Sequence, residues 1–188
     1  LGEAPVVMTV TRLTRQKGIA TLLEAAAIVH RQAPDVRFLL VGPRESEGPL
    51  AIARDEIDRH APYVRALGAR ADVPSLLQIA DVFAFPTELR EGVPRALMEA
   101  CVAGRPCVTT QMPGCTDVID HGTSGLVVPA RSPARLAEAV LQLLRDRATA
   151  RDYAARASAH VRKELNLDIT VDRYAAVYEE ILCRTGGA

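Results

Sequence analysis

The sequence predicts an α/β fold: a doubly wound, parallel six-stranded sheet with helices on both faces and further helices appended at the C-terminus. Two observations support this prediction. Short apolar runs bounded by turn residues alternate with longer segments of helical period, which is typical of strands joined by crossover helices around a parallel sheet. The chain of 188 residues has the size of one domain, and its 48% apolar content provides a sizeable core.

Six apolar runs are the predicted strands. Turn residues such as glycine, proline and aspartate flank them, and proline is tolerated at the first residue of a strand. The predicted strands are Val6–Val10, Val36–Val41, Tyr63–Leu67, Val82–Phe85, Pro106–Thr109 and Gly125–Val128.

Longer segments between and after these runs have helical period. The segment Gly18–Ala33 joins the first two strands, so we expect a right-handed crossover. Its apolar face consists of Ile19, Leu22, Leu23, Ala26 and Val29. Ser132 and Pro133 supply an N-cap and a first-turn proline for a later helix. Its apolar stripe consists of Leu136, Val140, Leu143 and Leu144.

The tail from Ala148 to Cys183 is predicted to form two helices that are broken near Leu165–Asp168. Apolar residues recur on one face of the second helix, which predicts that this face packs against other parts of the protein. The residues of this face are Tyr174, Val177, Tyr178 and Ile181.

Composition excludes several classes of protein. Acidic and basic residues balance at 23 each, so no overall field favours nucleic acid or an anionic membrane surface. The four cysteines form no C-x-x-C pair, and two lie in apolar runs, which indicates a reducing compartment such as the cytoplasm. No apolar stretch approaches the roughly 20 residues that span a bilayer. The chain starts at Leu1 rather than at methionine, as a piece excised from a longer protein would.

The loop after the first strand is cationic. Arg12, Arg15 and Lys17 precede a predicted helix, whose unsatisfied amides add partial positive charge. Phosphate is the natural partner, because a guanidinium binds phosphate oxygens in a bidentate way and lysine acts as a point charge. The alternative is that these are solvated loop charges. A lysine at a helix start opposes the helix dipole, which counts against a purely structural choice.

Glycines at strand ends also suggest ligand binding. Gly42 and Gly68 each close a predicted strand, where a missing side chain lets a ligand approach the backbone; an ordinary turn is the alternative. The first strand is followed by neither G-x-x-x-x-G-K-[ST] nor G-x-G-x-x-G. A P-loop NTPase or an ordinary dinucleotide dehydrogenase is therefore disfavoured.

Two glutamates, Glu91 and Glu99, follow the predicted strand Val82–Phe85. Open parallel sheets bind ligands outside the carboxyl ends of their strands. Glu91 precedes a helix predicted to begin near Val93, with Pro94 in its first turn, and Glu99 lies about 7.5 Å along that helix. The two carboxylates can therefore hold different hydroxyl groups of a sugar or ribose. Capping by Glu91, a surface position for Glu99 and a glycosidase carboxylate pair are the alternatives.

Several segments in order follow the pattern of a known family. Arg12-Leu13 and Lys17-Gly18 match the motif R-L-x-x-x-K-G, and the segment from Glu91 to Glu99 matches the motif E-x7-E. The other matching segments are Gly104–Val108, Pro113–Cys115 and Gly122–Pro129. The chain thus resembles the C-terminal, nucleotide-sugar-binding half of family 4 retaining glycosyltransferases of the GT-B fold. This resemblance covers nearly the whole chain. It implies that residues 1–188 form a Rossmann-like donor domain, with the N-terminal acceptor domain absent from the chain.

The resemblance also implies roles for the matching residues. Arg12 and Lys17 would neutralise the diphosphate of the donor, Glu91 would contact its sugar and Glu99 its ribose. Arg12, Lys17 and Glu91 are therefore the predicted catalytic residues. The other predicted donor contacts are Gly42, Leu67, Gly68, Gly92, Val93, Pro94, Arg95 and Ala96. Asp117 stands where the family often has a glutamate, so no role is carried over to it.

The implied activity is transfer of a glycosyl group, with retention, from a UDP-, GDP- or ADP-linked sugar to a glycan or lipid-linked acceptor. This transfer would need the N-terminal domain and could occur at the inner face of a membrane. Fixed cations and helix dipoles can stabilise the departing diphosphate, and no cluster of residues has metal-ligand spacing. We therefore expect no metal and no other cofactor. The balanced charge of the chain predicts no nucleic-acid partner. One half of a sugar-nucleotide 2-epimerase and a non-catalytic nucleotide-binding module are the alternatives.

Overall fold

The computed structural model describes residues 4–185, apart from the side chains at positions 45, 46, 183 and 185. Six parallel strands form one sheet in the order β3-β2-β1-β4-β5-β6. The strands are β1 (Val6–Val10), β2 (Arg37–Val41), β3 (Val64–Gly68), β4 (Val82–Phe85), β5 (Cys107–Thr110) and β6 (Leu126–Val128). All six predicted strands are thus confirmed, with no end displaced by more than one residue.

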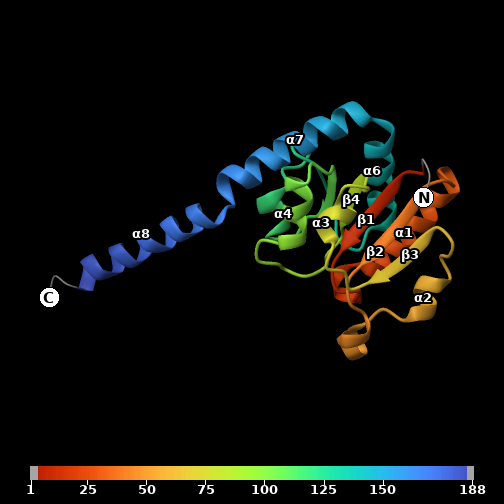
Figure 1. Ribbon diagram of the computed structural model, residues 1–188, viewed down its shortest axis with the longest axis horizontal. Coiled ribbons are helices and arrows are strands. Elements are labelled where there is room, and N and C mark those ends of the chain that lie inside the picture. The colour runs from red at the N-terminus through yellow and green to blue at the C-terminus, as the bar shows by residue number, and fades with distance from the viewer. Residues whose placement is uncertain (1–3, 186–188) are drawn as a thin grey trace.

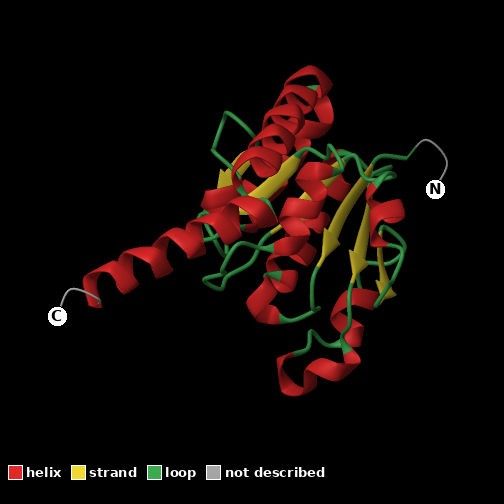
Figure 2. Cartoon of the chain, turned by 60° about the vertical axis from the view of Figure 1, so that its left-hand side comes forward, coloured by secondary structure: helices red, strands yellow, loops and turns green. Residues whose placement is uncertain are grey.

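Helices cover both faces of this sheet, as the second view shows (Figure 2). The helices are α1 (Ile19–Gln32), α2 (Arg54–Asp58), α3 (Val73–Leu77), α4 (Arg95–Val102), α5 (Cys115–Val118), α6 (Pro133–Arg145), α7 (Arg147–Glu164) and α8 (Leu167–Thr185), with short 3-10 turns η1 (Arg15–Lys17) and η2 (Glu45–Leu50). β1 pairs with β2 on one side and β4 on the other. The strand order therefore reverses between β1 and β4, and open parallel sheets bind ligands outside the carboxyl ends of the strands at such a point.

The core has two layers, one on each face of the sheet. On one face, Val7 and Phe38 pack in a cluster with the apolar sides of α1 and α6. On the other face, Met8 and Phe83 pack in a cluster with α4, α5 and α7. The predicted apolar face of α1 is wholly buried, which confirms it. Ser132 lies at the N-cap of α6 as expected, but its side chain makes no capping hydrogen bond.

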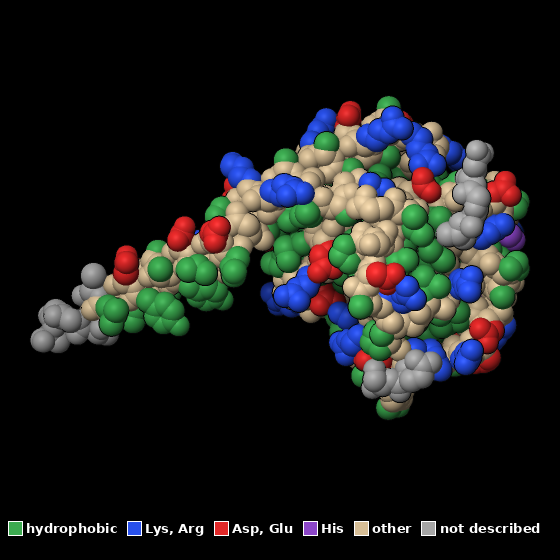
Figure 3. Space-filling model, in the orientation of Figure 1, with side chains coloured by type: hydrophobic (Ala, Val, Ile, Leu, Met, Phe, Trp, Pro, Cys, Tyr) green, Lys and Arg blue, Asp and Glu red, His purple; other side chains and the backbone are tan. Residues whose placement is uncertain are grey.

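The C-terminal helix α8 extends away from the body of the molecule (Figure 1). The break between α7 and α8 lies at Leu165-Asn166, as predicted. The predicted packing face of α8 is exposed in the structure. Its four residues, Tyr174, Val177, Tyr178 and Ile181, are between 52% and 66% exposed, and their apolar side chains gather along one side of the helix (Figure 3). Within the described chain, the prediction that this face packs is therefore wrong.

No helix in the described part of the chain is both long enough and apolar enough to cross a membrane.

Candidate functional site

The loops after β1 and β4 meet at the carboxyl edge of the sheet. Lys17 Nζ forms an ion pair with Glu91 Oε1, and Thr87 Oγ1 donates to the same carboxylate oxygen at 2.9 Å. The Lys17 and Glu91 side chains are only 11% and 18% exposed. Burying a charge is costly unless it is paired, and each of these two side chains neutralises the other.

Local backbone geometry fixes the position of Lys17. The Thr14 side chain accepts a hydrogen bond from the Lys17 amide at 3.3 Å, and Gly18 then turns the chain with φ 71°. A Cβ atom on Gly18 would lie 1.8 Å from the Pro86 carbonyl oxygen. Only glycine therefore lets the first loop approach the fourth this closely.

The loop after β5 supports Glu91 from the other side. The Glu91 amide donates to the Pro113 carbonyl at 3.3 Å. Gly114 has φ 85°, and a Cβ atom there would lie 1.8 Å from the Gly92 carbonyl oxygen. The next residue, Cys115, is fully buried; burial raises the pKa of its thiol, and the Glu91 carboxylate raises it further.

Arg12 does not join Lys17. Its guanidinium forms a 3.1 Å ion pair with Glu47 of η2, and its side chain is 54% exposed. The structure thus brings two of the three predicted catalytic residues, Lys17 and Glu91, into contact and places the third beside a different carboxylate.

Gly42 and Gly68 lie together at the ends of the paired strands β2 and β3. The Gly42 amide donates to the Gly68 carbonyl at 2.8 Å. Both glycines line a cavity of about 320 Å³ with Leu13 and Arg65. Leu67 immediately precedes Gly68 and is half-buried. Two of the predicted donor contacts, Gly42 and Gly68, therefore border a hollow beside β2 and β3.

Glu99 takes no part in the Lys17–Glu91 contact. It is exposed on α4 and lines a larger groove of about 820 Å³ with Arg95 and Met98. Pro74 of α3 and Leu165 at the end of α7 form other parts of this groove. The two glutamates are therefore not a facing acid and base pair.

The start of α4 differs slightly from the prediction. The helix begins at Arg95, and Pro94 is its N-cap rather than a first-turn residue. Gly92 and Val93 are exposed, whereas Ala96 is half-buried. The first amides of a helix have no partner within it, so those of Arg95 and Ala96 remain available for anion binding.

Sequence reasoning missed a second charged cluster at this edge. Glu88 accepts hydrogen bonds from Thr21 Oγ1 at 3.0 Å and from Arg131 Nε at 2.6 Å. Arg131 has a φ of 55°, a backbone conformation that residues other than glycine rarely adopt. The position of Glu88 just after β4 was a signal that could have been used. Nothing in the sequence indicated that Arg131 would reach it.

A family model described as "Glycosyl transferases group 1" matches residues 4–146. The chain is 29% identical over 97% of its length to the N,N'-diacetylbacillosaminyl-diphospho-undecaprenol alpha-1,3-N-acetylgalactosaminyltransferase of Campylobacter jejuni, of which it covers 46%. It is 34% identical over 83% of its length to the GDP-mannose-dependent alpha-(1-6)-phosphatidylinositol monomannoside mannosyltransferase of Mycobacterium tuberculosis, of which it covers 43%. The chain therefore spans less than half the length of each relative.

Among solved structures, the Anabaena protein Alr3699/HepE in complex with UDP and glucose superimposes with a TM-score of 0.81. The identity is 25%, and the match covers 93% of this chain and 48% of the Anabaena chain. Sucrose-phosphate synthase from Thermosynechococcus elongatus has a TM-score of 0.84 at 24% identity, over 97% of this chain and 46% of the synthase. The six-stranded parallel sheet is thus the fold of these larger proteins over about half of their length.

Proposed function

The chain belongs to the glycosyl transferases group 1 family, and on this premise we propose that it binds a nucleotide-diphosphate-sugar and, together with a second half, transfers the glycosyl group with retention. The observation that carries this proposal is the Lys17–Glu91 pair. It places a cation suited to a diphosphate and a carboxylate suited to sugar hydroxyls at one point of the carboxyl edge.

The hydrogen bonds of this pair leave capacity for a ligand. Glu91 Oε1 accepts from both Lys17 and Thr87, whereas Oε2 accepts from no residue that the structure describes. An ammonium group carries three donors, and Lys17 Nζ uses one of them on Glu91. We assign Oε2 to a donor-sugar hydroxyl and the remaining Lys17 donors to the diphosphate, whose growing charge they stabilise as the glycosidic bond breaks.

Arg12 and Glu99 contact two further groups of the same ligand. In this proposal a diphosphate oxygen replaces Glu47 as the partner of Arg12, which is already half exposed. Glu99 binds the ribose, and the backbone at Gly42, Leu67 and Gly68 borders the base. A resident metal has no assigned role, because the fixed charges and the α4 amides can neutralise the diphosphate.

The second half would supply the acceptor site and cover the exposed face of α8. The lengths of the relatives support this, since the chain matches less than half of each. Both relatives have names that specify lipid-linked acceptors, so we propose a lipid-linked or surface-glycan acceptor here. In this proposal the isolated chain binds the donor but has little or no transferase activity.

Calorimetric titration with UDP, GDP and ADP tests donor binding. Lys17→Met should weaken binding of the preferred nucleotide about tenfold or more, because a hydrogen bond between charged groups is lost. Lys163→Met is the matched control: Lys163 is the other lysine of the chain and is 82% exposed, so binding should not change. Absence of binding by all three nucleotides, or equal losses in both variants, would contradict the proposed site.

The anomeric configuration of the product tests retention in the longer protein. Nuclear magnetic resonance of the first product formed should show the anomeric configuration of the donor. A product of inverted configuration would overturn the retaining mechanism but not donor binding. Nucleotide binding without transfer would favour the non-catalytic module, and interconversion of sugar nucleotides would favour the epimerase.

A further inference from the structure

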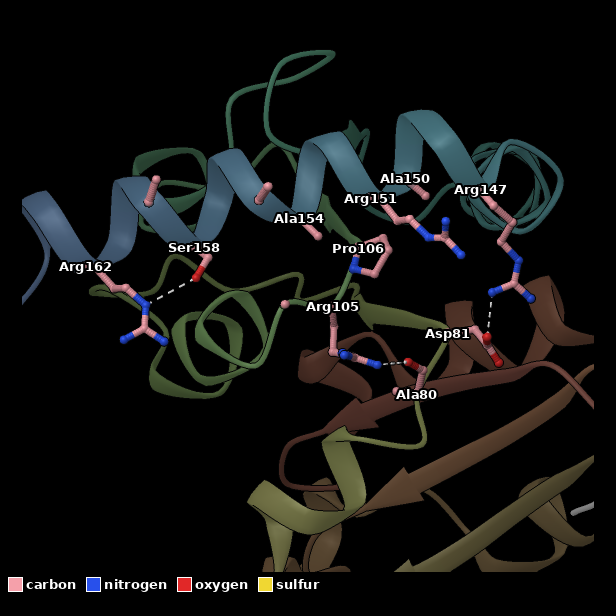
Figure 4. Close-up of a pocket in the computed structure, with 13 residues that line it drawn as sticks. Ala80, Asp81, Arg105, Pro106, Arg147, Ala150, Arg151, Ala154, Ser158 and Arg162 are labelled. Atoms are coloured by element: carbon pink, nitrogen blue, oxygen red, sulfur yellow. Dashed lines mark hydrogen bonds and ion pairs between the residues drawn. The ribbon is translucent and has the colours of Figure 1, made fainter.

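A further cavity lies at the opposite edge of the sheet from Lys17 and Glu91. It has a volume of about 630 Å³ and lies between α7 and the residues that precede β4 and β5 (Figure 4). Four arginines line it, together with one carboxylate, that of Asp81. The arginines are Arg105, Arg147, Arg151 and Arg162. Positive charge therefore exceeds negative charge along its walls.

Contacts with the body of the protein hold three of these guanidinium groups in place. Arg147 Nη1 donates to Asp81 at 2.6 Å. Arg105 donates to the carbonyl oxygens of Ala103 and Ala80, each at 3.0 Å. Arg162 donates to the Val102 carbonyl at 3.3 Å. A guanidinium has five N–H donors, so each anchored arginine retains donors for a ligand and loses little entropy when it binds one.

Arg151 differs from the other three. Its side chain forms no hydrogen bond or ion pair with any residue in the described part of the chain. Its side chain extends from α7 on the same side as that of Arg147, toward the start of the strands (Figure 4). An exposed cation without a partner, beside anchored cations, favours an anionic occupant.

The other walls of the cavity are small and apolar. Ala150 and Ala154 of α7 and Pro106 before β5 lie between the arginines. The volume is within the range of small-molecule sites, which combine apolar walls with a few placed polar groups. An occupant can therefore have a carbon skeleton as well as charged oxygens.

We propose that this arginine groove, defined by Arg105, Arg147, Arg151 and Arg162, is a second ligand site that binds the phosphate group of a small phosphorylated molecule. Guanidinium forks match phosphate oxygens in a bidentate way. Arg151 and Arg147 hold the phosphate, while Ala150, Ala154 and Pro106 contact the rest of the molecule. The site is separate from the proposed donor site, so either can be correct without the other.

Titration of the labelled protein with inorganic pyrophosphate tests this proposal by nuclear magnetic resonance. The amides of Ala154 and Ser158 report on the arginine groove, whereas those of Lys17 and Gly18 report on the carboxyl edge. We expect saturable shifts at Ala154 and Ser158, with affinity reduced about tenfold in Arg151→Gln through loss of a charge-assisted contact. The fold should be unaffected, because Arg151 has no partner to lose, and thermal unfolding checks this.

Arg156→Gln is the matched control. Arg156 lies on the same helix but outside the groove, and its guanidinium donates to the Thr123 carbonyl at 3.2 Å, so pyrophosphate affinity should not change. A second arm measures sedimentation with phosphatidylcholine vesicles that contain or lack phosphatidic acid. Binding to phosphatidic acid that Arg151→Gln alone abolishes, without pyrophosphate shifts in α7, would identify a lipid headgroup as the source of the phosphate. The proposal is overturned if neither probe binds, if the shifts do not saturate, or if both variants lose affinity equally.

Discussion

The two edges of the sheet handle charge in opposite ways. At the carboxyl edge, Lys17 and Glu91 are largely buried and neutralise each other, and glycines bring three loops into contact around them. At the amino edge, four arginines share one cavity with a single carboxylate. Two of them are anchored to backbone carbonyls and one to that carboxylate. At the carboxyl edge, Lys17 and Glu91 each need the other to offset the cost of burial, whereas the amino edge carries an excess of positive charge. Substitutions at the carboxyl edge should therefore lower the free energy of unfolding more than substitutions at the amino edge, which should mainly remove charge.

Two glycines of nearly equal φ provide the largest expected difference in stability between the two edges. Gly18 at the carboxyl edge has φ 71° and Gly104 at the amino edge has φ 72°, but only Gly18 has an atom within 4 Å of an added Cβ. Gly18→Ala should lower the free energy of unfolding by about 3 kcal/mol, because the Pro86 backbone must move. Gly104→Ala should cost only about 1 kcal/mol of left-handed strain. Urea denaturation measures both, and equal losses would show that the close approach of the loops contributes nothing.

Removing one cation from each edge should give a smaller contrast. Lys17→Met should cost about 2 kcal/mol of unfolding free energy, since Glu91 is left partly buried without its partner. Arg147→Met should cost less than about 1 kcal/mol, because Arg147 is 49% exposed and solvent screens its pair with Asp81. The double variant Lys17→Met/Glu91→Met should recover most of the stability of the first edge while leaving nucleotide binding impaired. A double variant no more stable than Lys17→Met would contradict the unpaired-charge explanation.

A change of pH should produce the smallest difference in stability between the two edges. His60 lies in the turn before β3, where burial and then the charge of Arg59 lower its pKa below the ordinary 6.5. The unfolded chain therefore binds a proton more readily, so the stability that neutral His60 contributes is lost as pH falls through about 6.5. Cys115 has the opposite behaviour, because a raised thiol pKa reduces stability only at alkaline pH. Unfolding at pH about 7.5 and about 5.5 should show a weaker pH dependence in His60→Gln; an unchanged dependence would assign the effect to other groups.

Hydrophobic period predicted most of the fold. The alternation of short apolar runs with helical segments was sufficient for the six strands, and the Gly18–Ala33 pattern identified a helix whose apolar face is indeed buried. Periodicity also identified a hydrophobic face on α8. It could not identify what covers that face, because an apolar stripe indicates burial without specifying a partner.

The candidate site was less predictable, because side-chain pairing depends on loop geometry. Parallel topology brought the Lys17 and Glu91 loops to one edge, as the sequence indicated. The pairing of Arg12 with Glu47 depends on η2, which no pattern predicted. The arginine groove was missed for a related reason: Arg105 and Arg151 are distant in sequence, and only the path of α7 across the strand ends brings them together.

The direction of α8 has a mechanical consequence. A helix of 19 residues is about 28 Å long. It follows α7 through Leu165-Asn166, and Arg173 of α8 forms an ion pair with Glu164 of α7. A change of about 10° at this joint would move its far end by about 5 Å. In the proposed function the second half covers the exposed face of α8, so this joint would act as a pivot. Small torsional changes there would then set how far apart the two halves stand during each catalytic cycle.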